Sequence, residues 1–242
     1  MCGIVGYTGE KGAQPQLLKA LRELEYRGYD SSGIAILGDS INIYKAKGRV
    51  EELEKATPQF PGLMGIGHTR WATHGEPSVV NAHPHTDCTG KFAVVHNGVI
   101  TNYQALKDEL IHEGHRFLSE TDTEVIPHLI EKYFEGNLEE AVAETLVRLQ
   151  GSYAIAVIAQ DNPKMVVAKN GSPLVIGLGI SENMIASDVP PLLDCTNRVI
   201  YMDDGEVGII TKDTVRINRG GQEVAKKASI IDLHIEDTQK GE

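Results

Sequence analysis

The sequence has few cysteines and no long apolar run, and each scarcity excludes a class of protein. Its three cysteines, Cys2, Cys88 and Cys195, are an odd number at wide spacing, which argues against a disulfide framework. No apolar stretch approaches the ~18 residues that a membrane-spanning helix needs, and the first residues lack a basic-then-apolar signal segment. We therefore expect a cytoplasmic protein with reduced thiols and no membrane partner.

Basic residues are also in deficit, because 23 Lys and Arg stand against 34 Asp and Glu, for a formal net charge of −11. The acidic residues are spread along the chain, which favours solubility. A protein that binds a phosphate backbone usually presents a basic face. We therefore expect no nucleic-acid partner.

Short apolar segments separated by turn sequences such as "DNP", "NGSP" and "DDGE" predict antiparallel sheets. Helical periodicity appears in four other segments, the first of which follows Pro15. The predicted class is α+β, with sheets sandwiched by helices. We expect strands over 3–7, 33–37, 41–46, 65–70, 91–97, 152–160, 164–170, 173–179, 184–187, 198–202 and 206–211, and helices over 15–27, 102–114, 121–134 and 138–151.

The chain of 242 residues, 41% of them hydrophobic, shows no internal linker, so we expect one domain over residues 1–242. Residues 235–242 are polar and lack a packing pattern, which is typical of a linker stub or a frayed end.

Cys2 is the first candidate for chemistry, because it stands next to the start of the chain in "MCGIVGY". After removal of Met1 it would carry a thiol and a free α-amino group on one residue. That amine has a pKa of about 7.8, against ~10.4 for lysine, so it is a far better base at pH 7. Cys2 would then combine a nucleophile and its base, which suits attack on an amide. The alternative is a cysteine that lies there by chance.

Arg70 ends a predicted strand and opens the polar loop "WATHGEP". A guanidinium there can grip a carboxylate through two parallel hydrogen bonds. Thr73 and His74 add a hydroxyl and an imidazole to the same loop. The alternative is a solvated loop with an ion-paired arginine.

Two further segments each allow a structural and a functional interpretation. Asn97-Gly98 is a pair typical of hairpin turns, yet its amide and main-chain N–H groups would also suit an oxyanion hole. Thr121 and Glu124 have the spacing of a helix capping box, with Asp122 in the first turn. Asp122 would also suit a ligand ammonium, so that Arg70 and Asp122 would hold the two charged ends of an α-amino acid.

Histidines are concentrated in the same region, which raises the alternative of a zinc hydrolase. They lack a helical H-x-x-x-H or a cysteine pair, so we expect no metal and no cofactor. Five of the nine histidines lie between residues 68 and 96: His68, His74, His83, His85 and His96.

Several long motifs together resemble one family. "MCGIVGY", "EYRGYDSSGIA", "GIGHTRWATHGEPS", "NAHPH", "VVHNGVI" and "SETDTEV" are similar to the glutaminase domain of the glutamine–fructose-6-phosphate aminotransferases, over effectively the whole chain. These are class II glutamine amidotransferases among the N-terminal-nucleophile hydrolases. The resemblance implies a four-layer αββα sandwich of two mainly antiparallel sheets.

The resemblance also implies roles for individual residues. Cys2 would be the nucleophile and Asn97 with Gly98 the oxyanion hole. Arg70, Thr73 and His74 would bind the substrate carboxylate, and Asp122 with the Gly98 carbonyl the ammonium. Three positions come from the resemblance alone: Arg27 as a brace for the nucleophile strand, Trp71 on a closing loop, and His83 as a further pocket residue.

The implied reaction is hydrolysis of L-glutamine to glutamate and ammonia. Family members are longer and carry a sugar-isomerase part that receives ammonia and binds fructose 6-phosphate, and this chain ends at Glu242 before any such part. We therefore expect a glutaminase domain that meets fructose 6-phosphate only through that missing part, and that is monomeric or weakly dimeric. The alternative is a catalytically silent module that binds glutamine and regulates a partner.

Overall fold

The computed structural model describes residues 2–72 and 75–232. The segment predicted to be a linker stub, 235–242, therefore lies outside the described residues. Within them, no helix is long and apolar enough to cross a membrane.

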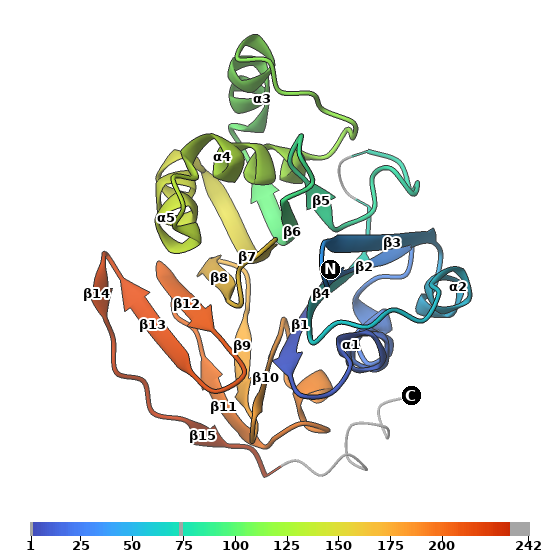
Figure 1. Ribbon diagram of the computed structural model, residues 1–242, viewed down its shortest axis with the longest axis vertical. Coiled ribbons are helices and arrows are strands. Elements are labelled where there is room, and N and C mark those ends of the chain that lie inside the picture. The colour runs from blue at the N-terminus through green and yellow to red at the C-terminus, as the bar shows by residue number, and fades with distance from the viewer. Residues whose placement is uncertain (1, 73–74, 233–242) are drawn as a thin grey trace.

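Two antiparallel sheets form the middle of the molecule, with helices on both outer sides (Figure 1). The first sheet has the order β15-β11-β9-β10-β1-β4-β2-β3. Its strands are β1 (Gly3–Gly9), β2 (Ser31–Leu37), β3 (Ile41–Lys47), β4 (Met64–Arg70), β9 (Val175–Leu178), β10 (Glu182–Ala186), β11 (Arg198–Tyr201) and β15 (Ser229–Ile230).

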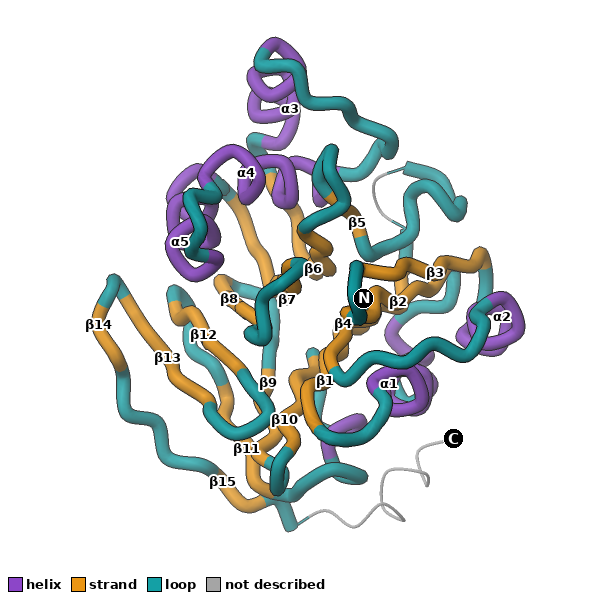
Figure 2. Tube along the Cα trace, viewed as in Figure 1, coloured by secondary structure: helices purple, strands orange, loops and turns teal. Residues whose placement is uncertain are grey.

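The second sheet has the order β14-β13-β12-β8-β7-β6-β5. Figure 2 shows how it faces the first sheet across the interior. Its strands are β5 (His85–Thr86), β6 (Phe92–Ile100), β7 (Gly151–Ala159), β8 (Met165–Asn170), β12 (Glu206–Ile210), β13 (Val215–Arg219) and β14 (Gln222–Glu223).

Helices cover the outer face of each sheet, on opposite sides of the molecule (Figure 1). On the first sheet lie α1 (Ala13–Arg22) and α2 (Val50–Ala56), with the 3-10 turns η1 (Glu25–Arg27) and η3 (Pro190–Leu192). On the second lie α3 (Tyr103–His112), α4 (Val125–Tyr133) and α5 (Leu138–Arg148), with the 3-10 turn η2 (Asp122–Glu124).

Three apolar cores separate these four layers, which explains why the central strands are buried on both faces. Along β1, Val5 packs in the core beneath α1 and α2. Its neighbour Ile4 packs in the core between the sheets. In β6, Val94 packs beneath α3, α4 and α5, while Val95 faces the other sheet. Because strand side chains alternate between faces, a middle strand is apolar on both faces where it crosses these cores, and the predicted αββα sandwich is confirmed.

The predicted strands are all present, whereas two predicted helices differ and some elements were missed. In the segment 121–134, Asp122–Glu124 forms the 3-10 turn η2, and the α-helix α4 spans Val125–Tyr133. The helix expected over 15–27 ends at Arg22, and Glu25–Arg27 forms a separate 3-10 turn. The helix α2 and the strands β5, β13, β14 and β15 were not predicted from the sequence. In β13 only the central residue, Ile217, is buried, so its apolar signal was weak.

Candidate active site

Cys2, the predicted nucleophile, directly precedes β1, and its thiol lies against the backbone of Trp71. The Trp71 N–H donates to Cys2 Sγ at 3.3 Å, and the thiol donates to the Trp71 carbonyl oxygen at 3.5 Å. Antiparallel pairing of β1 with β4, which sets Gly3 opposite Thr69, brings these distant residues together. The sheet therefore fixes the position of the sulfur.

Burial raises the pKa of the Cys2 thiol above its usual value of 9.0. The hydrogen bond from Trp71 and the positive charges of Arg70 and Arg27 act in the opposite direction and offset burial only in part. A thiol with a raised pKa is mostly protonated at neutral pH, and the thiolate is the reactive form. Chemistry at Cys2 therefore requires a base close to the sulfur.

The carbonyl oxygen of Cys2 is held by two side chains. Arg27 Nε donates to it at 3.1 Å and Asn97 Nδ2 donates at 3.0 Å. Arg27 is almost completely buried, and its other end forms an ion pair with Asp188 at 3.0 Å. Arg27 thus contacts the residue that directly precedes β1, the strand that the resemblance expected it to brace.

His68 orients the side chain of Asn97, a function that the sequence analysis missed. Its Nε2 lies 3.0 Å from Asn97 Oδ1 and 3.1 Å from the His96 carbonyl oxygen. Both partners are acceptors, so Nε2 carries the proton, and burial lowers the pKa of His68 to about 3. The neutral ring therefore turns the Asn97 amide so that its N–H groups face Cys2. The sequence held one signal for this position. Side chains alternate between the two faces of a strand, so His68 lies on the same face of β4 as the site residue Arg70, two residues further on.

Asn97 and Gly98 do not form a turn, so the turn interpretation of this pair was wrong. Both lie within β6, where they pair with Ala154 and Tyr153 of β7. Gly98 has φ +131°, and a Cβ there would lie 2.1 Å from the Ser152 carbonyl oxygen. Only glycine allows the strand to continue through this conformation, and the exposed Gly98 backbone borders the cavity beside Cys2.

Asp122 lies in η2 with its side chain almost completely buried. Its Oδ2 accepts a hydrogen bond from the Ile100 N–H at 2.8 Å, which ties η2 to the end of β6. The carboxylate therefore has a fixed place at the wall of the cavity.

The predicted capping box of Thr121 and Glu124 does not form. The Thr121 hydroxyl contacts Ser119 Oγ and His85 Nε2 instead of capping a helix. Glu124 accepts from the N–H groups of Leu118 and Ser119, at 2.7 and 2.6 Å. The carboxylate thus holds the segment before η2, because tertiary hydrogen bonds replace the local motif.

Arg70, the last residue of β4, is buried and lines the same cavity. Its guanidinium donates to the carbonyl oxygens of Gly75 and Glu76, at 3.0 and 3.3 Å, so it also holds the loop that follows the strand. Burial lowers the pKa of Arg70, and the charges of Cys2, Asp30 and Asp122 oppose that effect.

Trp71 and His83 also line the cavity. The Trp71 side chain is 46% exposed and packs edge-on against Tyr29. The His83 ring stacks on His68, with 4.0 Å between ring centroids, and accepts a hydrogen bond from the His96 N–H. Burial places the pKa of His83 well below its usual value, so this ring is neutral.

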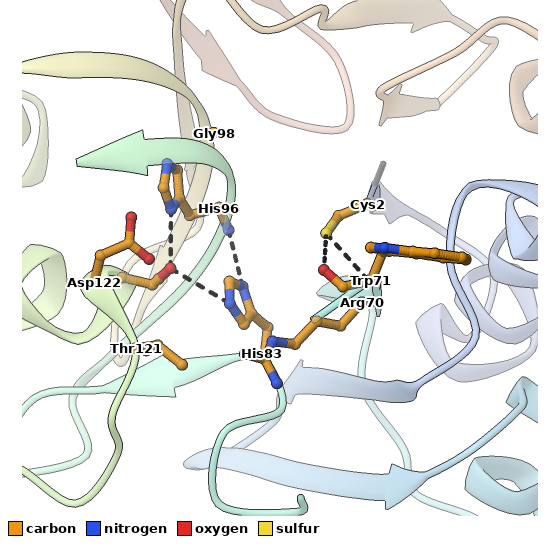
Figure 3. A pocket seen from close by; sticks show the side chains of 9 residues that line it. Cys2, Arg70, Trp71, His83, His96, Gly98, Thr121 and Asp122 are labelled. Atoms are coloured by element: carbon orange, nitrogen blue, oxygen red, sulfur yellow. Dashed lines mark hydrogen bonds between the residues drawn. The ribbon is translucent and has the colours of Figure 1, made fainter. Parts of the chain in front are cut away.

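The cavity is small, with a volume of about 30 Å³, and is partly open to solvent. Figure 3 shows Cys2 and Arg70 entering it from one side and Asp122 from the other. A cation and a carboxylate therefore border one small space with the thiol at its edge. The lining residues are Cys2, Arg70, Trp71, His83, His96, Gly98, Thr121, Asp122 and Thr123.

Two predicted site residues, Thr73 and His74, lie outside the described residues. Of the other histidines considered for zinc, His68, His83 and His96 contact one another through ring stacking or hydrogen bonds. Within the described ranges, the side chains gathered closely enough to hold a metal ion form a different group, which includes no histidine between residues 68 and 96.

The family model and the relatives that match this chain agree on one family. The model of the glutamine amidotransferase domain matches residues 68–194. The chain is 51% identical over 246 residues to the glutamine–fructose-6-phosphate aminotransferase (isomerizing) of Caldanaerobacter subterraneus subsp. tengcongensis, covering 100% of this chain and 40% of that protein. The Aquifex aeolicus protein of the same name is also 51% identical, with 100% and 42% covered. The chain thus spans about two fifths of the length of these curated relatives.

A solved structure shares the fold. Glutamine phosphoribosylpyrophosphate amidotransferase from B. subtilis, complexed with ADP and GMP, superimposes with a TM-score of 0.77 at 27% identity. The match covers 90% of this chain and 49% of that one. The same arrangement of two antiparallel sheets between helices is therefore present in an amidotransferase.

Proposed function

The chain belongs to the glutamine amidotransferase domain family, and from that premise we propose that it releases ammonia from L-glutamine by attack of Cys2 on the side-chain amide. The observation that supports this most directly is the arrangement around one cavity. The Cys2 sulfur lies at its edge, and Arg70 and Asp122 supply opposite charges across it. A free amino acid carries the complementary pair, so its carboxylate would bind Arg70 and its ammonium Asp122.

The first step needs the α-amino group of Cys2, which is free only after Met1 has been removed. This amine would take the thiol proton as Sγ bonds to the amide carbon. The negative charge that develops on the amide oxygen would be met by Asn97 Nδ2–H and Gly98 N–H. Each such donor is worth about 3 kcal/mol in the transition state. The protonated amine would then give its proton to the amide nitrogen as the C–N bond breaks, so that ammonia leaves and the thioester forms.

The resulting γ-glutamyl thioester on Cys2 would be hydrolysed by water, which regenerates the thiol and gives glutamate. Three hydrogen bonds to Cys2 support this cycle, because they keep the nucleophile in place. Arg27 and Asn97 donate to its carbonyl oxygen, and the Trp71 N–H donates to its sulfur. Thr73 and His74 would assist Arg70, and Trp71 would lie on the loop that closes over the substrate.

The activity of the whole protein is a further part of the proposal. The two relatives named above are aminotransferases that act on fructose 6-phosphate by name, and this chain matches about two fifths of their length. We propose that ammonia released here serves that amination through the portion that the relatives carry beyond the shared region. We also propose that residues 1–242 form one glutaminase domain, that the protein is cytoplasmic, and that this domain is monomeric or weakly dimeric.

The test compares Cys2→Ala with the parent chain after intact-mass measurement has verified that Met1 is absent. We expect the parent to release ammonia from glutamine and the variant to show only background. Glutamine should also slow alkylation of Cys2, whereas Cys195, which lies outside the cavity, should alkylate at an unchanged rate and serves as the internal control. Ammonia release by the alanine variant would refute the mechanism. Glutamine binding without turnover in the processed parent would favour the regulatory module.

A further inference from the structure

Four side chains outside the proposed active site converge on one point. They are Cys88, in the turn between β5 and β6; His115, just after α3; and His128 and Glu131, three residues apart on α4. One ligand atom of each lies within 4.8 Å of all the others. None of the four lines the cavity beside Cys2. Figure 1 shows α3, α4 and β5 together at one end of the molecule.

The distances within this Cys88–Glu131 cluster match the edges of a tetrahedron. Cys88 Sγ lies 3.8 Å from His115 Nδ1 and 3.6 Å from His128 Nδ1, and the two nitrogens are 3.3 Å apart. Glu131 Oε2 lies 3.1 and 3.6 Å from the same nitrogens. Around Zn²⁺, with bonds of about 2.0–2.3 Å, adjacent nitrogens are ~3.3 Å apart and a nitrogen and a sulfur ~3.6 Å.

Hydrogen bonding within the cluster cannot satisfy all of these contacts. Each proton on a thiol or ring nitrogen can serve one short contact well, yet each Nδ1 atom has three such neighbours. A cation at the centre would engage the sulfur, both nitrogens and the carboxylate at once. Thiolate, imidazole and carboxylate form the ligand set that Zn²⁺ accepts.

The surroundings favour His128 Nδ1 as a lone-pair donor. His128 is 1% exposed, and its other nitrogen, Nε2, lies 3.9 Å from Glu124 Oε1 with no hydrogen-bond partner among the described residues. A proton on Nε2 faces that carboxylate, which leaves the Nδ1 lone pair directed at the cluster. Carboxylates beyond metal-bound histidines have this function in many metal sites. The Arg116 N–H also donates to Cys88 Sγ at 3.3 Å, a contact that suits a thiolate ligand.

We propose that Cys88, His115, His128 and Glu131 bind one Zn²⁺ ion in a closed, structural site. With four protein ligands the ion would have no open position for substrate, so its effect would be on stability. It would join the β5–β6 turn, the end of α3 and α4. No metal was predicted from the histidines between residues 68 and 96, whereas these ligands come from three separate segments of the chain, the β5–β6 turn, the end of α3 and α4.

The test is metal content of the purified chain after exposure to Zn²⁺ and dialysis against metal-free buffer. We expect about one equivalent of zinc in the parent, and little in Cys88→Ser and in His115→Ala. Cys195→Ser is the matched control, because it makes the same thiol-to-hydroxyl change at a cysteine that lies outside the cluster. Cys2→Ala checks that zinc is not held by the N-terminal thiol. Both of these should retain the full equivalent.

Two further readouts separate binding from misfolding. Co²⁺ in place of Zn²⁺ should give the visible bands of a tetrahedral site and a thiolate charge-transfer band that Cys88→Ser lacks. Free Zn²⁺ at 100 times its dissociation constant should raise the Tm of the parent by about 5–10 °C, and that of Cys88→Ser much less. Absence of retained zinc in the parent, or equal retention in Cys88→Ser, would overturn the proposal.

Discussion

Replacement of His68 by phenylalanine tests whether the orientation of Asn97 depends on the buried ring. The ring N–H donates to Asn97 Oδ1 and to the His96 carbonyl oxygen, and both acceptors are buried. Phenylalanine fills a similar space but leaves these two acceptors without their donor, at roughly 1–3 kcal/mol each. The free energy of unfolding should therefore fall by about 2–6 kcal/mol.

The effect on catalysis should appear in kcat. Without His68 the Asn97 amide is free to rotate, and its N–H groups no longer need to face Cys2. Loss of one oxyanion donor lowers kcat by about 10²–10³-fold. KM should change little, because the affected contact forms in the transition state. Ammonia release at saturating and limiting glutamine separates kcat from KM.

His68→Gln is the matched variant that keeps the experiment interpretable if the phenylalanine variant is unstable. The glutamine Nε2 is separated from the main chain by as many bonds as the histidine Nε2, and it also carries N–H groups. We expect His68→Gln to retain most of the stability and kcat within about tenfold of the parent. A folded His68→Phe with the kcat of the parent, beside an inactive Asn97→Ala, would refute the reasoning.

Two further predictions concern stability. Gly98→Ala should lower the free energy of unfolding in urea by at least about 2 kcal/mol, because the added Cβ would lie 2.1 Å from the Ser152 carbonyl oxygen. Gly90→Ala is the control, since Gly90 also has a positive φ of +72° but no atom lies within 4 Å of its Cβ, so this variant should lose less stability. Equal losses in the two variants would contradict the explanation. Burial lowers the pKa of Lys45 from 10.5 to about 8, although the charge of Glu124 opposes this shift. Between pH 8 and pH 10.5 the folded state therefore binds fewer protons than the unfolded state, and the chain gains stability as the pH rises through this range. Lys45→Met should accordingly stabilise the chain by roughly 3 kcal/mol at pH 7, with the gain shrinking towards pH 10.5; a gain independent of pH would rule out this origin.

The sequence predicted the layers well because burial on both faces leaves a strong signal. A strand such as β6 must be apolar at nearly every position, and Val94 and Val95 show this directly by packing into different cores. The leucines of α1, including Leu17 and Leu21, repeat with helical spacing and are fully buried. Where one face is solvated, as in β13, the signal weakened and the element was missed.

Individual site residues were harder to predict because local motifs compete with tertiary contacts. Asn97-Gly98 has the composition of a turn, yet pairing with β7 keeps it in a strand. Thr121 and Glu124 have the spacing of a capping box, yet both side chains bond to residues outside it. The function of His68 depends on what lies opposite β4 in space, which one strand alone does not reveal.

The stability of β1 explains how a residue at the start of a chain can hold a reactive group in place. Chain ends usually fray unless they are tied down. Here β1 pairs on both sides, with β4 and β10, and the Cys2 carbonyl just before it accepts from Arg27 and Asn97. In the proposed mechanism the nucleophile and the base belong to one residue, so fixing that residue positions both. A free main-chain amine exists only at the N-terminus of a chain. The paired strand β1 starts at the next residue and holds that amine in a fixed position, where it can act as a base.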